Sequence, residues 1–383
     1  MKKLLKTIFL MFILVSLVSC NKTEKLFPEN RDKLVFDASQ TKQINKVNMD
    51  IFTALLKNKK TDDNLVLSPL SIQRCLDLIS LCTDDRENLE FLKNYDDAHL
   101  QNLKLKNSNL ANLILINTKI FTGDTKNLNY DNIKTVKNGK DATKVYQDFQ
   151  KKNLKEILDK EEFKNDFIIS FIDAVNYDAK WDKKFDEKNT KMKEFTKLDD
   201  SVINVNTMYN QFKDSLAISD NEKEAFVLSA NESKVYFIKP KTKNYFSSKK
   251  LMECIKAFND NSEKADVNFF LPKIETKSEV DFKSLFSELG LEKMLNGYKL
   301  EKLLKNVGVK VTDAKQNSIL KIDENGAKAK AVTKITNKAT AIPGKKEITI
   351  KMDSPFYIII VDHDEKSKSN LITFSAFITD PSN

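Results

Sequence analysis

The segment between residues 324 and 344, ENGAKAKAVTKITNKATAIPG, constrains the fold more than any other part of the chain. Small residues occupy every second position from 327 to 333, and lysines fill most of the positions between them. Such alternation is typical of a strand with one buried and one solvated face. The buried face would offer little more than methyl groups, so its own packing would hold such a strand only weakly.

An alanine-rich solvent helix is the alternative for this segment, because alanine and lysine both favour helix. Alanines at every second position form no continuous helical face, however. Val332, Thr333, Ile335 and Thr336 also favour extended backbone. We therefore expect an extended segment, followed by an exposed loop at ATAIPG.

The N-terminal segment MKKLLKTIFLMFILVSLVSC has the form of a secretory signal. Its apolar run, from Ile8 to Val18, is too short to span a bilayer comfortably. The run ends in LVSC, which resembles the lipobox of bacterial lipoproteins, where the cysteine (here Cys20) is lipidated and becomes the first residue. An ordinary signal peptide is the alternative. We predict a signal peptide at 1–19, a lipidated Cys20 with a polar tether to residue 40, and a single domain from 41 to 383.

Composition and the scarcity of histidine argue against several classes of function. Lysines and arginines number 64 against 55 aspartates and glutamates, but the two signs are interleaved, which indicates a solvated surface and no nucleic-acid partner. The two histidines, His99 and His363, lack metal-ligand spacing, and no catalytic motif is present. We expect His363 in a solvated hairpin turn. Cys75, Cys82 and Cys254 make an odd number of cysteines after Cys20, which argues against a disulfide scaffold, and we expect buried free thiols at Cys75 and Cys82. We also expect no metal, no cofactor and no enzymatic activity.

The order of segments along the chain predicts an α+β fold without a βαβ repeat. Helical patterns are expected at 41–60, at 69–80 after a Ser-Pro start, and at 281–295. Strand-like patterns are expected at 110–121 and 166–177, and then in AFVLSAN, KVYFIKP, VNFFLPKI, EITIKM, FYIIIVD and LITFSAFI.

Seven motifs in order give this chain a resemblance to the serpin family. They are NLVLSPLSI at 64–72; the spacing of Trp181, Phe185, Thr190 and Phe195; FLPK at 270–273; DFKSLFSELG at 281–290; DENG at 323–326; Pro355-Phe356; and the final strand from Phe374 to Pro381. The resemblance implies a serpin fold, with a helical half, large mixed or antiparallel sheets and an exposed reactive-centre loop at about 324–346.

The resemblance also explains the weak strand. In serpins this loop is bait for a protease, and after cleavage its front half enters the main sheet as a new strand. An inserting strand needs small inward residues, and a permissive backbone where it pivots. The implied hinge and insertion residues are Glu324, Gly326, Ala327, Ala329, Ala331 and Thr333. The implied function is suicide inhibition of serine proteases, or alternatively cysteine proteases, by a monomer.

Counting along the loop suggests which bond is cleaved. Thr340 lies fourteen residues beyond Gly326, and counting back from Pro355 allows positions 340–344. Both counts include the Thr340–Ala341 bond, which suits elastase-like or subtilisin-like enzymes with shallow apolar pockets. Cleavage after Lys338 or Lys345 is the rival prediction and would suit trypsin-like enzymes.

Several positions depart from the family pattern. In serpins an Asn–His pair lies under the region where the sheet opens, and the matching places here are Asp173 and Gln316, near Ser68 and Ser71. Because only 23 residues separate Phe149 from Asp173, we expect the helix that covers the front of the main sheet to be truncated or absent. A shortened stretch at 83–109 argues against a glycosaminoglycan site.

Two classes of function remain open at the level of sequence. The first is a membrane-tethered protease inhibitor, and the second is a non-inhibitory serpin-fold lipoprotein for binding or adhesion. The second would tolerate bulky or charged inward hinge residues, which this chain lacks. A general hydrolase ranks third, for want of catalytic residues. Since Asn21 is not an acidic retention signal, we expect the outer membrane or the cell surface of a bacterium.

Overall fold

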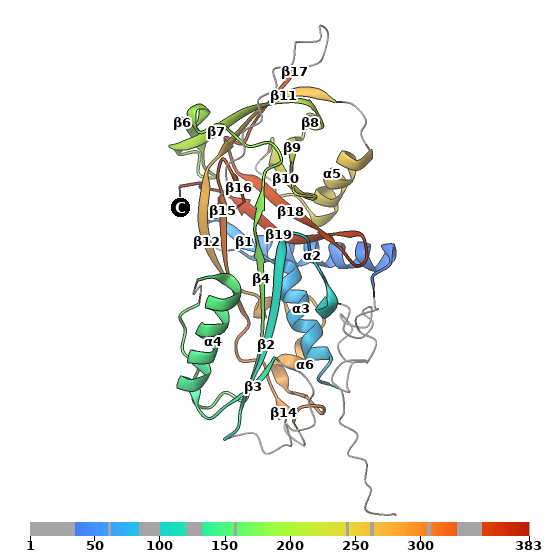
Figure 1. The fold of residues 1–383 in the computed structure, drawn as a ribbon, viewed down its shortest axis with the longest axis vertical. Helices are drawn as coiled ribbons and strands as arrows, with labels where there is room; N and C mark the ends of the chain where they lie inside the picture. Colours follow the sequence, from blue (N-terminus) through green and yellow to red (C-terminus); the bar gives the residue numbers. More distant parts are fainter. Residues whose placement is uncertain are drawn as a thin grey trace, which may run out of the picture.

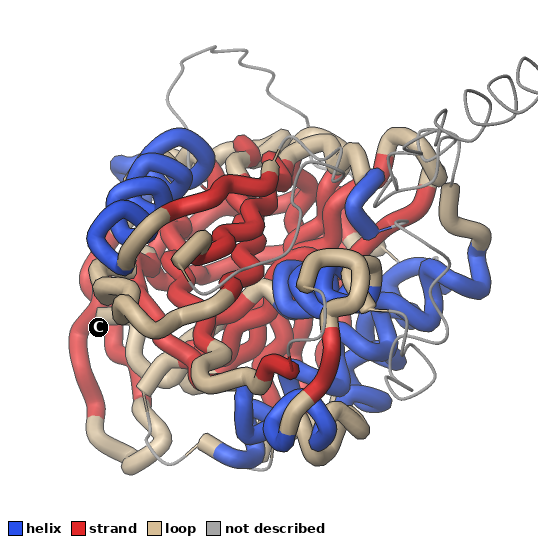
Figure 2. Tube along the Cα trace, turned by 90° about the horizontal axis from the view of Figure 1, so that it is seen from below, coloured by secondary structure: helices blue, strands red, loops and turns tan. Residues whose placement is uncertain are grey.

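The computed structural model describes residues 35–59, 63–83, 100–119, 132–156, 159–242, 245–260, 264–304, 308–327 and 347–382. Viewed from below, strands fill the middle of the molecule and helices lie around them (Figure 2). Figure 1 shows the elements along the long axis. The architecture is α+β, as the sequence predicts.

A six-stranded antiparallel sheet forms the centre of the fold, in the order β1-β19-β18-β10-β9-β8. Its longest apolar run, FYIIIVD, is almost wholly buried because the sheet is covered on both faces. The strands are β1 (Leu65–Leu67), β8 (Ala217–Ser219), β9 (Lys223–Ala230), β10 (Ser233–Pro240), β18 (Phe356–Asp364) and β19 (Ser369–Ile378).

Two further groups of strands surround this centre. A mixed four-stranded sheet has the order β17-β11-β7-β6, with β17 (Glu347–Lys351), β11 (Ala265–Pro272), β7 (Val202–Ser215) and β6 (Lys191–Thr196). A three-stranded sheet of β3 (Ile133–Val136), β2 (Ser108–Asn117) and β4 (Ile169–Tyr177) and a separate pair of β15 (Lys315–Ile322) and β12 (Ile274–Asp281) are together called the main sheet. Short pairs join β5 (Ala179–Lys180) to β16 (Gly326–Ala327) and β13 (Tyr298–Lys299) to β14 (Gly308–Val309).

The helices begin at polar caps that the sequence supplies. At the first helix, Asp37 accepts a hydrogen bond from the Gln40 backbone (2.8 Å) while Gln40 reaches back to the Asp37 backbone (3.0 Å). Ser68 caps the next helix, with Pro69 in its first turn. The helices are α2 (Ala38–Asn58), α3 (Pro69–Ser80), α4 (Gly139–Leu154), α5 (Ser248–Asp260) and α6 (Glu292–Asn296), with 3-10 turns η4 (Leu100–Asn102), η6 (Glu187–Asn189) and η7 (Lys283–Leu285).

Two apolar cores hold these layers together. One lies among α2, α3, α5 and the inner face of the main sheet. The other lies between the six-stranded and four-stranded sheets, where Phe226, Phe237 and Phe269 meet with ring centroids 4.6 Å and 5.5 Å apart. Aromatic packing of this kind adds to the stabilisation from buried area.

Most predicted elements are confirmed, but the expected continuous helix at 281–295 is wrong. The chain there forms η7, a turn and the short helix α6. Gly290 takes a left-handed φ of +67° between them, and the cap residue Phe282 makes no side-chain hydrogen bond. The break allows Leu285, Phe286 and Leu291 all to point into the core.

The expectation that the covering helix is truncated or absent is also wrong. α4 runs for 16 residues and packs on β2, β3 and β4 through an apolar group that includes Leu113, Leu115, Ala142 and Ile172. The short spacing to β4 is absorbed by the connection after the helix, whose described residues, 155–156 and 159–168, form no helix or strand. This helix therefore covers one face of the main sheet (Figure 1).

Histidine and cysteine residues lie close to their expected places. His363 is the next-to-last residue of β18, just before the hairpin turn, and its Nδ1 lies 3.1 Å from Oδ1 of Asn370. Cys82 and Cys254 are buried free thiols, and Cys75 is a half-buried one. Within the described residues no group of metal-ligating side chains is found, and no helix is long and apolar enough to cross a membrane.

Candidate functional site

The main sheet is divided by a gap between β4 and β15. Within the described chain, β4 pairs with β2 on one side only, and β15 pairs with β12 on one side only. The two free edges border a cavity of about 1180 Å³, lined by residues 168–177 on one flank and 308–321 on the other. Free strand edges present rows of N–H and C=O groups that an added strand can satisfy.

The hinge begins a strand at the head of this gap. After β15 the chain makes a tight turn, in which Asp323 and Gly326 exchange backbone hydrogen bonds of 3.1 Å and 3.3 Å. β16 then pairs antiparallel with β5, which follows β4 after a single residue. Residues 326–327 therefore lie between the end of β15 and the extension of β4.

Three hydrogen bonds to backbone carbonyls of this turn attach it to Trp181 and Phe185, which follow β5. The Trp181 indole Nε1 donates to the Asp323 carbonyl (2.9 Å), and the Trp181 backbone donates to the Asn325 carbonyl (3.1 Å). The Phe185 backbone donates to the Glu324 carbonyl (3.0 Å). The Trp181 and Phe185 side chains are buried, so this anchor is part of the core.

The Glu324 side chain forms a second anchor. It is almost fully buried, and its carboxylate accepts hydrogen bonds from the Thr190 hydroxyl (2.7 Å) and the Lys273 ammonium (2.9 Å). Burial opposes ionisation of Glu324, but these two donors outweigh it and hold the pKa of the carboxyl below its usual value. An ion pair thus joins the hinge to Lys273, the residue that follows β11 of the four-stranded sheet.

Gly326 is required by the geometry of the pivot. Its φ of +156° is unfavourable for any residue with a side chain. A Cβ atom at this position would also lie 2.3 Å from the Ala179 carbonyl oxygen and 2.7 Å from the Lys180 Cα. Close approach of β16 to β5 therefore depends on glycine.

The four predicted sheet-opening residues all lie along the gap. Gln316 accepts from the Ser68 backbone N–H (2.7 Å) and donates to the Ser68 carbonyl (3.0 Å), which attaches β15 to the start of α3. Ser71 donates to the Asp173 carbonyl (3.5 Å), which attaches β4 to the same helix. The helix α3 thus contacts both edges of the gap.

Asp173 and Gln316 do not contact each other. Asp173 Oδ2 instead pairs with Arg74 Nε at 2.9 Å, and the two side chains are 1% and 2% exposed. The Arg74 guanidinium also donates to the Leu100 carbonyl. Burial raises the pKa of Asp173 to about 6, although the Arg74 charge and the Ser71 hydroxyl pull it down. The sequence comparison of positions 173 and 316 missed Arg74 as the partner.

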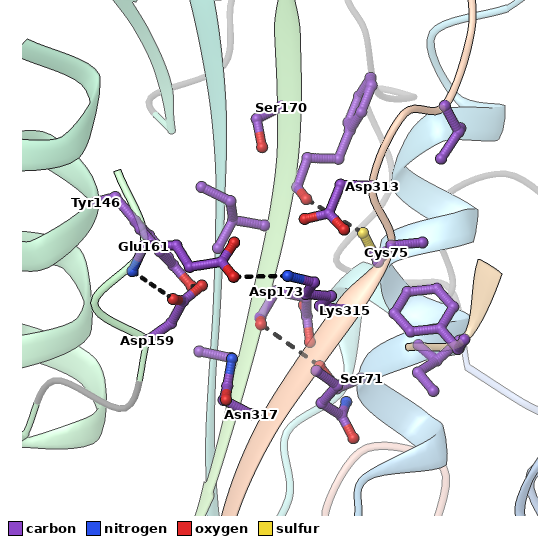
Figure 3. A pocket seen from close by; sticks show the side chains of 18 of the residues that line it. Ser71, Cys75, Tyr146, Asp159, Glu161, Ser170, Asp173, Asp313, Lys315 and Asn317 are labelled. Carbon is purple, nitrogen blue, oxygen red and sulfur yellow. Dashed lines mark hydrogen bonds and ion pairs between the residues drawn. The ribbon is translucent and has the colours of Figure 1, made fainter. Parts of the chain in front are cut away.

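An ion pair crosses the gap on its outer side. Glu161, in the connection between α4 and β4, binds Lys315 of β15 at 2.6 Å. The neighbouring Asp159 accepts from the Tyr146 hydroxyl of α4 at 3.1 Å. Figure 3 shows Tyr146, Asp159 and Glu161 on one side of β4 and Ser71 and Cys75 of α3 on the other, with the ion pair between Glu161 and Lys315 passing across β4.

The remaining predicted residues fall outside the described chain. These are Cys20, the insertion residues Ala329, Ala331 and Thr333, the proposed bond between Thr340 and Ala341, and the rival sites Lys338 and Lys345. Only the backbone of Ala327 is described, as part of β16.

Two further residues of the site, Arg74 and Lys273, stand out in the sequence, although the motifs alone do not predict their contacts. Arg74 is a single charged residue within the apolar helix segment LSIQRCL, a pattern that suggests a buried partner. Lys273 belongs to the FLPK motif, but its contact with the hinge joins residues 51 positions apart. Such a contact depends on the tertiary fold.

Comparison with known proteins agrees with this arrangement. The family model described as "Serpin (serine protease inhibitor)" matches residues 115–381, so the chain belongs to the serpin family. Two silkworm (Bombyx mori) relatives are Antitrypsin, 24% identical over 80% of this chain and 87% of its own length, and Antichymotrypsin-2, 23% identical over 81% and 91%. The family and these relatives are protease inhibitors, and this chain is accordingly an inhibitor-family protein and not an enzyme.

Solved structures share the fold. The thermophilic serpin Tengpin in its native state has a TM-score of 0.73 at 20% identity, covering 91% of this chain and 96% of its own. Human glycosylated kallistatin has a TM-score of 0.72 at 17% identity, covering 90% and 99%. Human thyroxine-binding globulin, solved in complex with thyroxine, has a TM-score of 0.70 at 19% identity, covering 90% of this chain and 100% of its own. At these identities the similarity establishes the fold alone.

Proposed function

We propose that this protein is a membrane-tethered serpin that inhibits serine proteases as a suicide substrate. The observation that carries the proposal is the gap between β4 and β15, together with a hinge that has already paired as β16 at its head. The residues that follow the hinge alternate small and long side chains, as a strand entering that gap requires.

The mechanism follows from this geometry. The target's nucleophile attacks the bait carbonyl, the peptide bond to the next residue breaks, and that residue leaves as a protonated amine, so that the front part of the loop stays on the protease as an acyl-enzyme. The cut loop then extends β16 along the gap and satisfies both free edges, which releases free energy. The attached protease is carried along the sheet, and distortion of its catalytic residues prevents deacylation. The four residues at the middle of the gap would have to admit the new strand.

We place the reactive bond between Thr340 and Ala341, which favours elastase-like or subtilisin-like targets. A cysteine protease, or cleavage after Lys338 or Lys345, is the alternative. The test is incubation with a protease panel, followed by a denaturing gel and mass spectrometry of the released peptide. An SDS-resistant adduct and a fragment that starts at Ala341 would support the proposal. Fragments that start at Ala339 or Lys346 would assign the rival bonds.

We also propose that Cys20 is acylated and that the protein is held at the outer membrane or cell surface of a bacterium. Support comes from the signal segment and the LVSC sequence. The wild type should enter the detergent phase in a phase partition, and Cys20→Ser should move to the aqueous phase. A wild type found wholly in the aqueous phase would refute the anchor.

A non-inhibitory binding protein is the alternative function. The shared fold with thyroxine-binding globulin, whose structure contains thyroxine, indicates that this fold also serves binding. The protease panel separates the two proposals. A non-inhibitory protein would be cleaved or ignored by every protease, and no adduct would form.

A further inference from the structure

Three asparagines in the chain are followed directly by glycine, at 138–139, 296–297 and 325–326. In such a pair the backbone nitrogen of the glycine can attack Cγ of the asparagine side chain, because glycine leaves that nitrogen uncrowded and its own backbone free to turn. The local structure then decides which pair reacts. The third pair lies in the turn that joins β15 to β16.

The attacking nitrogen is held most loosely in the third pair. Gly326 N donates to the Asp323 carbonyl over 3.3 Å. The corresponding bond is 2.9 Å long in both other pairs, where Asn165 Oδ1 and the Lys293 carbonyl are the acceptors. A longer hydrogen bond is a weaker one. The nitrogen of Gly326 is therefore the easiest of the three to release for attack.

The side-chain amide of Asn325 is also placed for attack. Its Oδ1 accepts a hydrogen bond from the Lys184 ammonium at 3.2 Å. A cation at this oxygen stabilises the negative charge that develops there when the amide carbon is attacked. Its Nδ2 donates no hydrogen bond to the described residues, so the leaving group is not held in place. Asn325 is half-buried, which leaves it accessible to water.

The other two amides lack this arrangement. Asn138 caps α4, and its Oδ1 and Nδ2 are both occupied by Asp141, at 2.9 Å and 3.0 Å. Asn296 donates through Nδ2 to the Glu292 carbonyl at 3.3 Å. Within the described part of the chain, no ammonium donates to either amide oxygen. The fold therefore favours reaction at the third pair over the first two.

We propose that Asn325–Gly326 is a site of covalent self-modification, at which the folded chain closes an imide ring and reopens it as isoaspartate or aspartate. Gly326 N loses its proton and bonds to Cγ of Asn325, while the Cγ–Nδ2 bond breaks and Nδ2 leaves as ammonia. A water molecule then opens the ring at one of its two carbonyls. Lys184 contacts the reacting amide and assists the first step.

Isoaspartate would not fit the turn. It routes the main chain through the former side chain and so adds one atom to the backbone before Gly326. Gly326 already lies so close to β5 that a Cβ atom there would be 2.3 Å from the Ala179 carbonyl oxygen. The longer backbone should therefore separate β16 from β5. Loss of inhibition would follow if this turn is the hinge, and this consequence alone rests on the proposed function.

Ageing of the intact, full-length protein at mildly alkaline pH tests the proposal. Peptide mass spectrometry follows the conversion of amide to acid at each of the three pairs, and labelling by an isoaspartyl methyltransferase identifies isoaspartate. In the folded protein, position 325 should react roughly tenfold faster than positions 138 and 296, less than the effect of an oxyanion donor in an enzyme because the turn is partly exposed. In denaturing urea the three rates should be similar, because only the fold distinguishes the pairs.

Variants separate the role of the ammonium from general effects. Lys184→Met keeps the aliphatic stem and should slow the reaction at position 325 by roughly tenfold in the folded protein but not in urea. Lys188→Met, at an exposed position nearby, should react as the wild type. Asn325→Gln would need a larger ring, so it should keep its melting temperature on ageing while that of the wild type falls.

Equal folded-state rates at the three pairs would overturn the proposal, and so would a rate at position 325 that Lys184→Met leaves unchanged. The inhibitory function is judged separately, on fresh protein. If fresh protein forms no adduct with any protease but position 325 still reacts as predicted, the inhibitory function fails and the modification site stands.

Discussion

At the scale of single residues, the contact between Lys273 and Glu324 decides how firmly the hinge is held. Replacing Lys273 by Met keeps the aliphatic stem but removes the charge, which leaves the buried Glu324 with only the Thr190 hydroxyl among its side-chain donors. We expect a loss of about 1–2 kcal/mol in the free energy of unfolding, measured by urea denaturation. Lys188→Met, at an exposed position nearby, is the control. Equal losses in the two variants would contradict the anchoring role.

Asp173 should give the stability of the protein a characteristic pH dependence. Its pKa is raised from 3.8 to about 6 in the folded protein, so the folded state binds more protons than the unfolded state between these values. Stability should therefore fall as the pH rises from about 4 to about 6, by on the order of 3 kcal/mol from this group, and then level off.

The side chain in Asp173→Asn cannot ionise, so the free energy of unfolding of this variant should lack the pH-dependent contribution of Asp173. Urea denaturation at several pH values, compared with the wild type and with the exposed-site control Asp148→Asn, isolates it. The prediction concerns how the free energy of unfolding changes with pH and not its absolute value, because the variant also changes the partner of the buried Arg74. A wild-type curve parallel to that of Asp173→Asn would show that the carboxyl titrates normally.

At the scale of secondary-structure elements, the ion pair between Glu161 and Lys315 ties the α4–β4 connection to β15 across the gap. Because both groups are partly exposed, the pair holds the two elements together only weakly, and we expect its effect on the rate to be no more than roughly fivefold. Glu161→Gln should accelerate complex formation with the target protease by up to this factor. Added salt should accelerate the wild type in the same way but not the variant.

The pair between Glu275 and Lys321 offers a control of the same chemistry. It joins β12 to β15 and does not cross the gap. Glu275→Gln should leave the rate and its salt dependence unchanged. If both glutamate variants changed the rate equally, the effect would come from general electrostatics and not from the crossing.

Elements with strong local patterns were predictable, and those defined by tertiary contacts were not. Ser68 and Pro69 predicted the start of α3, and the apolar run of β18 predicted a buried strand. β7 was missed because its asparagines and other polar residues obscure the alternation over 14 residues. The break in the helix expected at 281–295 arises from burial of Phe286 and Leu291, which periodicity alone does not show.

At the scale of the whole molecule, the motifs were sufficient to predict the family and the fold class, whereas the function of the turn at 323–326 as a hinge stays a prediction. The network around the gap was not predictable, because it joins residues distant in sequence. Arg74 pairs with a strand residue 99 positions away, and Gln316 binds Ser68 from 248 positions away. The length of α4 was also predicted wrongly, because the short distance in sequence between Phe149 and Asp173 was taken to indicate a short or missing helix.

The contacts described above all lie beside the gap between β4 and β15 or at its head. The hinge anchor, the buried ion pair and the outer salt bridge all involve β4, β5 or β15, or the turn between β15 and β16. Among the described residues, the structure thus combines two strand edges that pair on one side only with a set of contacts that, in the proposed mechanism, break when a strand fills the gap. Insertion of the loop would satisfy many backbone groups at once and should stabilise the molecule as a whole.

The thermal unfolding midpoint of intact and loop-nicked protein tests this central claim most directly. A protease that cuts between residues 328 and 346 without being trapped supplies the nicked form, and both forms are heated under identical conditions. We predict a markedly higher midpoint for the nicked protein, because its loop has become a central strand. Equal midpoints, or a lower one after nicking, would contradict insertion and with it the inhibitory mechanism.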